Sequence, residues 1–164
     1  MNARATDGGY LRPTASGRYV VKTFRLALAD APTNPDNLPL ANDPMLATAA
    51  ARAAFALLEP DQEHTIMFAL NARNRIIGYR HCYSGTIDRA VVEPRGILRD
   101  AILLGAVGII LSHNHPSGDP APSREDREFT RRLSTACEAI GIRLLDHIVV
   151  GTVSHVSFRE SGLL

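Results

Sequence analysis

The feature that most constrains the fold is an apolar run, residues 107–111, that leads directly into two histidines. The run is short, continuous and rich in isoleucine, as expected for a strand that is buried on both faces. A Pro/Gly-rich segment follows at 116–122, and it predicts a turn. Ser123 and Asp126 then have the spacing of a capping box, so a helix should begin there. The sequence therefore predicts a strand, a turn and a helix that bring residues 112–126 together.

The polar residues of this segment predict a metal site. His113 and His115 are separated by one residue, and Ser123 and Asp126 follow at fixed spacing. Imidazole nitrogens and carboxylate oxygens are ligands of Zn²⁺, and three protein ligands leave a fourth position open for water. We therefore expect His113, His115 and Asp126 to bind Zn²⁺ in a catalytic site. Helix capping also explains Ser123 and Asp126 taken alone, and the two roles are compatible.

The string His-x-His-x7-Ser-x-x-Asp is the JAMM motif, and residues 63–151 resemble the JAB/MPN metalloprotein domain of the bacterial RadC family. Further matching segments are residues 71–75, 84–86, 94–95 and 144–151. The resemblance implies an α/β fold with one zinc ion, and JAMM domains elsewhere are isopeptidases and deubiquitinases. RadC proteins also carry an N-terminal helix-hairpin-helix region, and no segment of this sequence has its glycine-rich hairpin. A DNA-binding role taken from that region is therefore unsupported.

The resemblance also suggests two catalytic residues. In JAMM proteins the catalytic glutamate lies at the start of a strand, and Glu63 directly precedes the β-rich run 64–70. Glu63 would accept a proton from the attacking water and return it to the leaving amine. Asp61 and Glu93 are the alternative bases, and a solvated loop glutamate is the simpler explanation of Glu63. Ser123 would stabilise the oxyanion by donating its hydroxyl, in competition with its role as a helix cap.

Composition limits the function classes. The net charge of +1 and the absence of tryptophan give no general drive toward nucleic acid. No apolar run approaches the length of a membrane span, and no signal peptide is evident. Cys82 and Cys137 are expected to be buried free thiols, which favours a cytoplasmic location. They are too far apart for the zinc clamp of a deaminase, and the adjacent residues 113–115 cannot play the separated roles of an HNH nuclease.

The expected architecture is α/β: a single JAB/MPN-like domain with a mixed central sheet flanked by helices. A flexible arm, 1–17, precedes the domain, 18–164, and an edge strand at 18–28 offers pairing with a second copy in a homodimer. Expected helices are 43–58, a segment from 94 to 104, and 123–140 with Phe129, Leu133, Ala136 and Ile140 facing inward. Expected strands are 64–70, 75–83, 86–92, 107–111, 142–150 and 153–158.

The sequence thus predicts zinc-dependent hydrolysis of a peptide or isopeptide bond in an unidentified protein or peptide substrate. A non-catalytic JAB/MPN interaction module is the first alternative, because relatives that lose the ligands persist as scaffolds. An accessory protein in DNA repair or recombination is the second, and only the family's name suggests it. Asp146 and His147 could form a pair that orients a metal ligand, but a hydrogen-bonded core histidine is the favoured interpretation.

Overall fold

The computed structural model describes residues 12–13, 19–20, 38–85 and 93–164. Its contacts divide the chain into two units, residues 1–30 and 31–164. In the first unit, β1 (Arg12–Pro13) pairs antiparallel with β2 (Tyr19–Val20). The rest of the expected 18–28 strand, the arm apart from residues 12 and 13, and the expected strand 86–92 lie outside the described residues.

The second unit is built on a five-stranded sheet with the order β4-β3-β5-β6-β7. Its strands are β3 (His64–Leu70), β4 (Ile76–Ser84), β5 (Gly108–Asn114), β6 (Arg143–Val150) and β7 (His155–Ser157). Strands β5 and β6 are parallel, and the other neighbours are antiparallel. The mixed sheet predicted from the sequence is therefore confirmed, with β5 at its centre.

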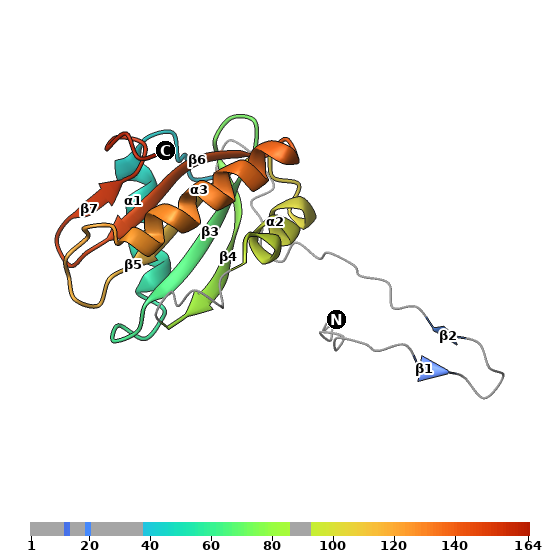
Figure 1. Ribbon diagram of the computed structural model, residues 1–164, viewed down its shortest axis with the longest axis horizontal. Helices are drawn as coiled ribbons and strands as arrows, with labels where there is room; N and C mark the ends of the chain where they lie inside the picture. Colours follow the sequence, from blue (N-terminus) through green and yellow to red (C-terminus); the bar gives the residue numbers. More distant parts are fainter. Residues whose placement is uncertain (1–11, 14–18, 21–37, 86–92) are drawn as a thin grey trace. The chain divides into compact units, whose positions relative to one another are not determined.

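Helices cover both faces of this sheet. The helix α3 (Arg124–Ala139) lies across one face, beside α2 (Pro94–Leu103), and α1 (Pro44–Phe55) lies on the opposite face (Figure 1). The α1 helix begins as expected, because the Asp43 carboxylate accepts the amide of Leu46 at 2.9 Å. It ends at Phe55 rather than at residue 58, because the chain tightens into three-residue turns there. No helix in the described part of the chain has the length and apolar character needed to cross a membrane.

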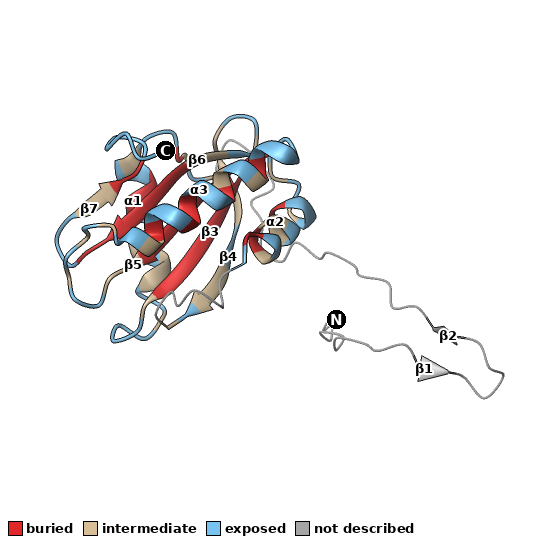
Figure 2. Cartoon of the chain, viewed as in Figure 1, coloured by how far each residue is buried: buried red, intermediate tan, exposed pale blue. Residues whose placement is uncertain are grey.

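The alternation of side chains along β3, β5 and β6 gives the sheet two cores, and these strands are the most buried part of the molecule (Figure 2). We call them the α1-face core and the α3-face core. The α1-face core consists of Ala41, Ala47, Ala51, Ile66, Phe68, Leu70, Ile76, Ile110, Ile148 and Val150. The α3-face core consists of Met67, Ala69, Ile97, Ala101, Ile109, Leu111, Phe129, Leu133, Cys137 and Ile142.

The inward face of α3 differs from the expected one. Phe129 and Leu133 are buried as predicted, but Ala136 is half-buried and Ile140 is 44% exposed. Cys137, four residues after Leu133, is buried in their place. The prediction was wrong because a period of 3.6 residues favours the step of four at this point, and because the helix ends before Ile140.

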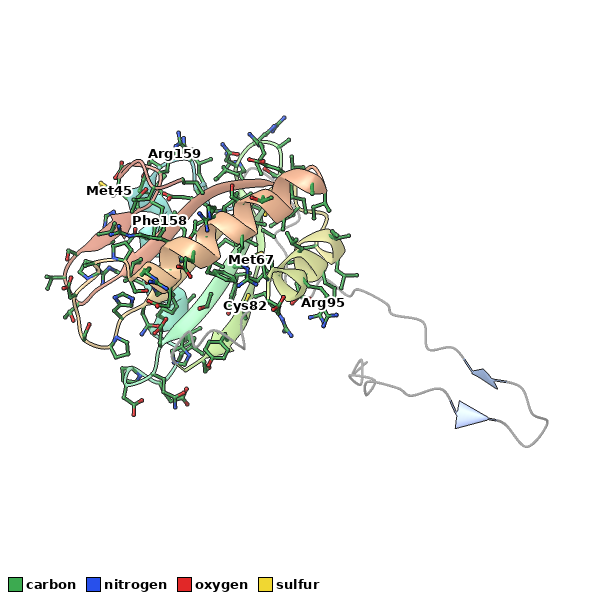
Figure 3. All side chains as sticks on the ribbon, in the orientation of Figure 1. Met45, Met67, Cys82, Arg95, Phe158 and Arg159 are labelled. Atoms are coloured by element: carbon green, nitrogen blue, oxygen red, sulfur yellow. The ribbon has the colours of Figure 1, made fainter. Side chains whose placement is uncertain are left out.

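Both cysteines are free thiols. Cys137 is buried as expected, whereas Cys82 is only half-buried on the edge strand β4. Met67 and Cys82, labelled in Figure 3, come from the neighbouring strands β3 and β4. Burial raises the pKa of each thiol to about 11, so both remain protonated at neutral pH.

Candidate metal centre

The first pair of candidate ligands comes from the end of β5. This strand runs through Asn114, three residues beyond the expected end at 111, so His113 is a strand residue with no exposed surface. The strand continues because β3 and β6 pair with it on both sides up to this point. His115 follows directly, and its amide donates to the Val150 carbonyl of β6 at 2.9 Å. The two histidines therefore lie at the end of the central strand, which is paired on both sides.

The third candidate ligand comes from the first turn of α3. Ser123 and Asp126 form the predicted capping box: the Asp126 amide donates to Ser123 Oγ at 3.0 Å, and the Ser123 amide donates to Asp126 Oδ2 at 2.8 Å. The Ser123 hydroxyl also donates to Asp126 Oδ2, at 2.6 Å. These bonds fix a carboxylate that is only 2% exposed. Capping and the proposed metal role thus coincide in Asp126, since the cap holds the carboxylate in place.

These elements bring the predicted residues together. His113 Nε2 lies 3.0 Å from His115 Nε2 and 3.3 Å from Asp126 Oδ1, and His115 Nε2 lies 3.7 Å from Asp126 Oδ2. With Glu63, which precedes β3, they form a group whose candidate ligand atoms all lie within 4.8 Å of one another. Asp61 and Glu93, the alternative bases, are not members of this group, and Glu93 faces Arg132 at 3.7 Å. The structure therefore assembles the predicted set around one point.

A hydrogen bond directs His115 toward this point. Its Nδ1 lies 2.7 Å from the backbone carbonyl of Asp119, which can only accept. In the neutral ring Nδ1 therefore carries the proton and Nε2 carries the lone pair. The Pro/Gly-rich turn thus contributes a carbonyl that selects the tautomer of the candidate ligand, as the partners of metal-bound histidines commonly do.

A chain of three hydrogen bonds does the same for His113. Its Nδ1 lies 2.8 Å from His147 Nε2, and His147 Nδ1 lies 2.6 Å from the Thr130 hydroxyl. That hydroxyl donates to the backbone carbonyl of Asp126 at 2.6 Å, so it accepts from His147 Nδ1. His147 Nε2 then accepts from His113 Nδ1. In the neutral ring of His113 the lone pair therefore lies on Nε2, the nitrogen that faces Asp126.

His147 fits both interpretations of the Asp146–His147 pair, since it is a core histidine and also hydrogen-bonds to a candidate metal ligand. His147 is a core histidine, as favoured: it is fully buried, and its ring stacks on Phe158 with centroids 4.6 Å apart. It also contacts a candidate ligand from a position 34 residues further along the chain. Burial lowers the pKa of His147 well below its usual value, so the ring is neutral. The Asp146 carboxylate faces elsewhere, accepting from Ser157 Oγ at 2.6 Å.

The pKa values of the two carboxyl groups, Asp126 and Glu63, shift in opposite directions. Burial favours the protonated form of Asp126, but the hydrogen bonds that Nε2 of His113 and His115 donate when these rings are protonated outweigh it and hold the pKa of this carboxyl far below its usual range. Burial raises the pKa of Glu63, with smaller opposing effects from the histidines. Asp126 therefore stays ionised, as a ligand must be, whereas Glu63 binds a proton more readily than an exposed glutamate does.

The donor set fits a metal ion. Two imidazole lone pairs and one ionised carboxylate converge, and each side chain is fixed by a hydrogen bond on its far side. The group formed by Glu63, His113, His115 and Asp126 could therefore hold a metal ion.

Comparison with known proteins gives the family of the chain. Residues 42–163 match the family model of the RadC-like JAB domain. The chain is 49% identical over 120 residues to the UPF0758 protein STH371 of Symbiobacterium thermophilum, which covers 69% of the chain and 50% of that protein. It is 46% identical over 103 residues to the UPF0758 protein YsxA of Bacillus subtilis, covering 63% of the chain and 45% of that protein.

The mixed sheet, the two-sided helical cover and the histidine–carboxylate group thus define a domain of the JAB class. Within that class, the chain belongs to the RadC-like JAB domain family. The chain spans about half the length of the relatives it matches.

Proposed function

We propose that this chain is a zinc-dependent hydrolase of the JAMM type, which cleaves a peptide or isopeptide bond in a protein or peptide substrate. The observation that carries the proposal is the convergence of Glu63, His113, His115 and Asp126, with all candidate ligand atoms within 4.8 Å. The proposed compartment is the cytoplasm, where both free thiols would stay reduced.

His113, His115 and Asp126 would hold the zinc ion through two nitrogens and one oxygen, the ligand types that zinc accepts in catalytic sites. When bound, zinc supplies Lewis acidity, which polarises a carbonyl and lowers the pKa of water toward about 7. The far-side hydrogen bonds of His113 and His115 keep both rings in the required tautomer, so little rearrangement precedes binding.

Glu63 is proposed as the group that moves the proton. It lies within reach of the ligand atoms but is not needed to complete a three-residue set. In hydrolysis, Glu63 takes a proton from the attacking water while the oxygen forms its bond to the scissile carbon. It then returns the proton to the leaving nitrogen as the carbon–nitrogen bond breaks, so that acid and amine are released.

Ser123 is proposed to stabilise the negative oxygen of the tetrahedral intermediate through its hydroxyl. In the structure this hydroxyl donates to Asp126 Oδ2 at 2.6 Å. The proposed role therefore requires the hydroxyl proton to rotate toward the substrate. Asp126 Oδ2 keeps the backbone amide of Ser123 as a donor after that rotation, at 2.8 Å.

Metal analysis of the purified protein tests the proposal. We expect about one zinc ion per wild-type chain, and none in His113→Ala or Asp126→Ala. Glu63→Gln should retain the zinc and lose turnover of peptide and isopeptide substrates, because the amide cannot take up the proton. A folded wild-type protein that refuses added zinc would contradict the proposal and favour a non-catalytic interaction module.

A further inference from the structure

Glu63 lies where two strands separate. Strands β3 and β5 are paired up to Thr65 and His113, and beyond this pair the chain after β5 turns toward β6. The His115 amide donates to the Val150 carbonyl of β6, so it offers nothing to β3. On the β5 side, the backbone around Glu63 therefore has no ladder partner at the position where the proposed base must be held, whereas β4 still pairs with the neighbouring His64 on the other side.

The side chain of Asn114 replaces that ladder. Its Oδ1 accepts the backbone amide of His64 at 2.7 Å, and its Nδ2 donates to the backbone carbonyl of Gln62 at 2.9 Å. The orientation of the side-chain amide is unambiguous, because the backbone N–H can only donate and the carbonyl can only accept. One side chain thus hydrogen-bonds to the backbone of the residues on both sides of Glu63. The carbonyl of Glu63 itself accepts the Gly85 amide at 2.7 Å.

We propose that Asn114 is a positioning residue, which holds Glu63 at a fixed distance from the histidine pair. Asn114 stands between His113 and His115 in the chain, so any shift of the histidines is transmitted to the backbone of Glu63. What Glu63 does when it is held there rests on the proposed function. The two hydrogen bonds of the Asn114 side chain are a property of the folded chain and can be measured without a substrate.

An ordinary turn-shaping role does not account for these bonds. Asn71, in the β3–β4 turn, shows that role: its Oδ1 accepts the amides of Arg73 and Arg75, two and four residues away. Asn114 instead bonds residues 50 and 52 positions away in sequence. A side chain that shapes only its own turn needs no such partners. Asn71 therefore provides a matched control.

Amide hydrogen exchange in the metal-free protein is the first test. We expect Asn114→Ala to speed exchange of the His64 amide about tenfold or more, with the amides in the centre of β3 unchanged. Asn114→Asp retains the acceptor, so it should protect this amide nearly as well as wild type. Asn71→Ala should leave the His64 amide unchanged and affect only its own turn. Wild-type exchange at His64 in Asn114→Ala would overturn the proposal.

Cobalt provides the second test, because Co²⁺ shifts nearby proton resonances according to their distance and direction. In Co²⁺-loaded wild type, the Glu63 methylene protons should give one set of shifted resonances. Asn114→Ala should move or broaden them while the ring resonances of His113 and His115 stay in place, and Asn114→Asp should lie between the two. Unchanged Glu63 resonances in Asn114→Ala would refute the positioning role.

The two tests separate this inference from the proposed function. If wild type binds neither Co²⁺ nor Zn²⁺, the proposed function fails, and the exchange of the His64 amide still decides whether Asn114 grips this segment. If both metals bind and Glu63→Gln is inactive, but the Asn114→Ala resonances match wild type, the hydrolase survives and the positioning role fails. Thermal unfolding of both Asn114 variants confirms that the compared proteins are folded.

Discussion

The two faces of the central sheet are built from the same strands but contain different chemistry. On the α1 face, most buried side chains of β3, β5 and β6 are aliphatic or aromatic, and the buried polar residues His64, Ser112 and Asp146 on this face bond to separate partners. On the α3 face, the apolar core gives way at one end to His113, Asp126, Thr130 and His147, all buried and hydrogen-bonded to one another. The comparison teaches that both faces contain an apolar core, whereas the α3 face also gathers buried polar side chains into one hydrogen-bonded group.

The end of β5 shows the difference within neighbouring residues. Ser112 faces the α1 side, and its hydroxyl is satisfied by a single bond to the Ile148 carbonyl at 3.0 Å. His113 faces the α3 side and has polar neighbours at both ring nitrogens. A buried hydroxyl needs only one partner, but a buried imidazole that presents a lone pair needs a donor–acceptor chain behind it. The α3 face provides that chain through two further elements, β6 and α3.

Loss of a metal ligand on the α3 face should have the largest effect on zinc binding, with little effect on the free energy of unfolding. We expect His115→Ala to abolish stoichiometric zinc binding, because two protein ligands remain from three. His115 belongs to neither apolar core, so the free energy of unfolding of the metal-free protein should fall by only about 1 kcal/mol, the contribution of its hydrogen bond to the Asp119 carbonyl. Metal analysis and chemical denaturation measure the two quantities. Stoichiometric zinc in His115→Ala would remove this residue from the ligand set.

Truncation of a side chain in the α1-face core should lower the free energy of unfolding strongly and leave zinc binding unchanged. Phe68 is 3% exposed, and we expect Phe68→Ala to lower the free energy of unfolding by about 3–5 kcal/mol through lost burial and a cavity. The folded fraction should still bind zinc at the wild-type ratio. Ile66→Val, at a neighbouring site in the same core, is the mild control at about 0.5–1.5 kcal/mol. Loss of zinc from folded Phe68→Ala would show that the two faces are not independent.

The sequence predicted the parts of the molecule that depend on local pattern. Strand β3 has the predicted bounds, and the capping box at Ser123 placed Asp126 correctly. From the sequence, contact of the Asp146–His147 pair with a metal ligand is only the less favoured interpretation, and His113 cannot be identified as the partner, because the contact depends on the parallel pairing of β5 with β6. The bonds of Asn114 depend likewise on where β3 and β5 separate. Propensity and spacing carry no information about such pairings, which only the assembled sheet decides.

The hydrogen-bond chain behind His113 gives a smaller effect. We expect His147→Ala to weaken zinc binding about 10–100-fold, because His113 loses the acceptor that selects its tautomer. Thr130→Val, which removes the last donor of the chain, should weaken binding less. Competition with a chelator of known affinity measures both. Wild-type affinity in His147→Ala would show that His147 serves only the core, as the stacking on Phe158 allows.

The smallest effect is expected from Ser112, a buried polar residue on the α1 face. Ser112→Ala removes the hydroxyl bond to the Ile148 carbonyl, and we expect a loss of about 1 kcal/mol in the free energy of unfolding. Zinc affinity should remain within about twofold of wild type, because Ser112 faces away from its neighbour His113. Denaturation and the same chelator competition provide both values. If Ser112→Ala weakened zinc binding as strongly as His147→Ala, the end of β5 would act as one unit, and the division between the two faces would stop at Leu111.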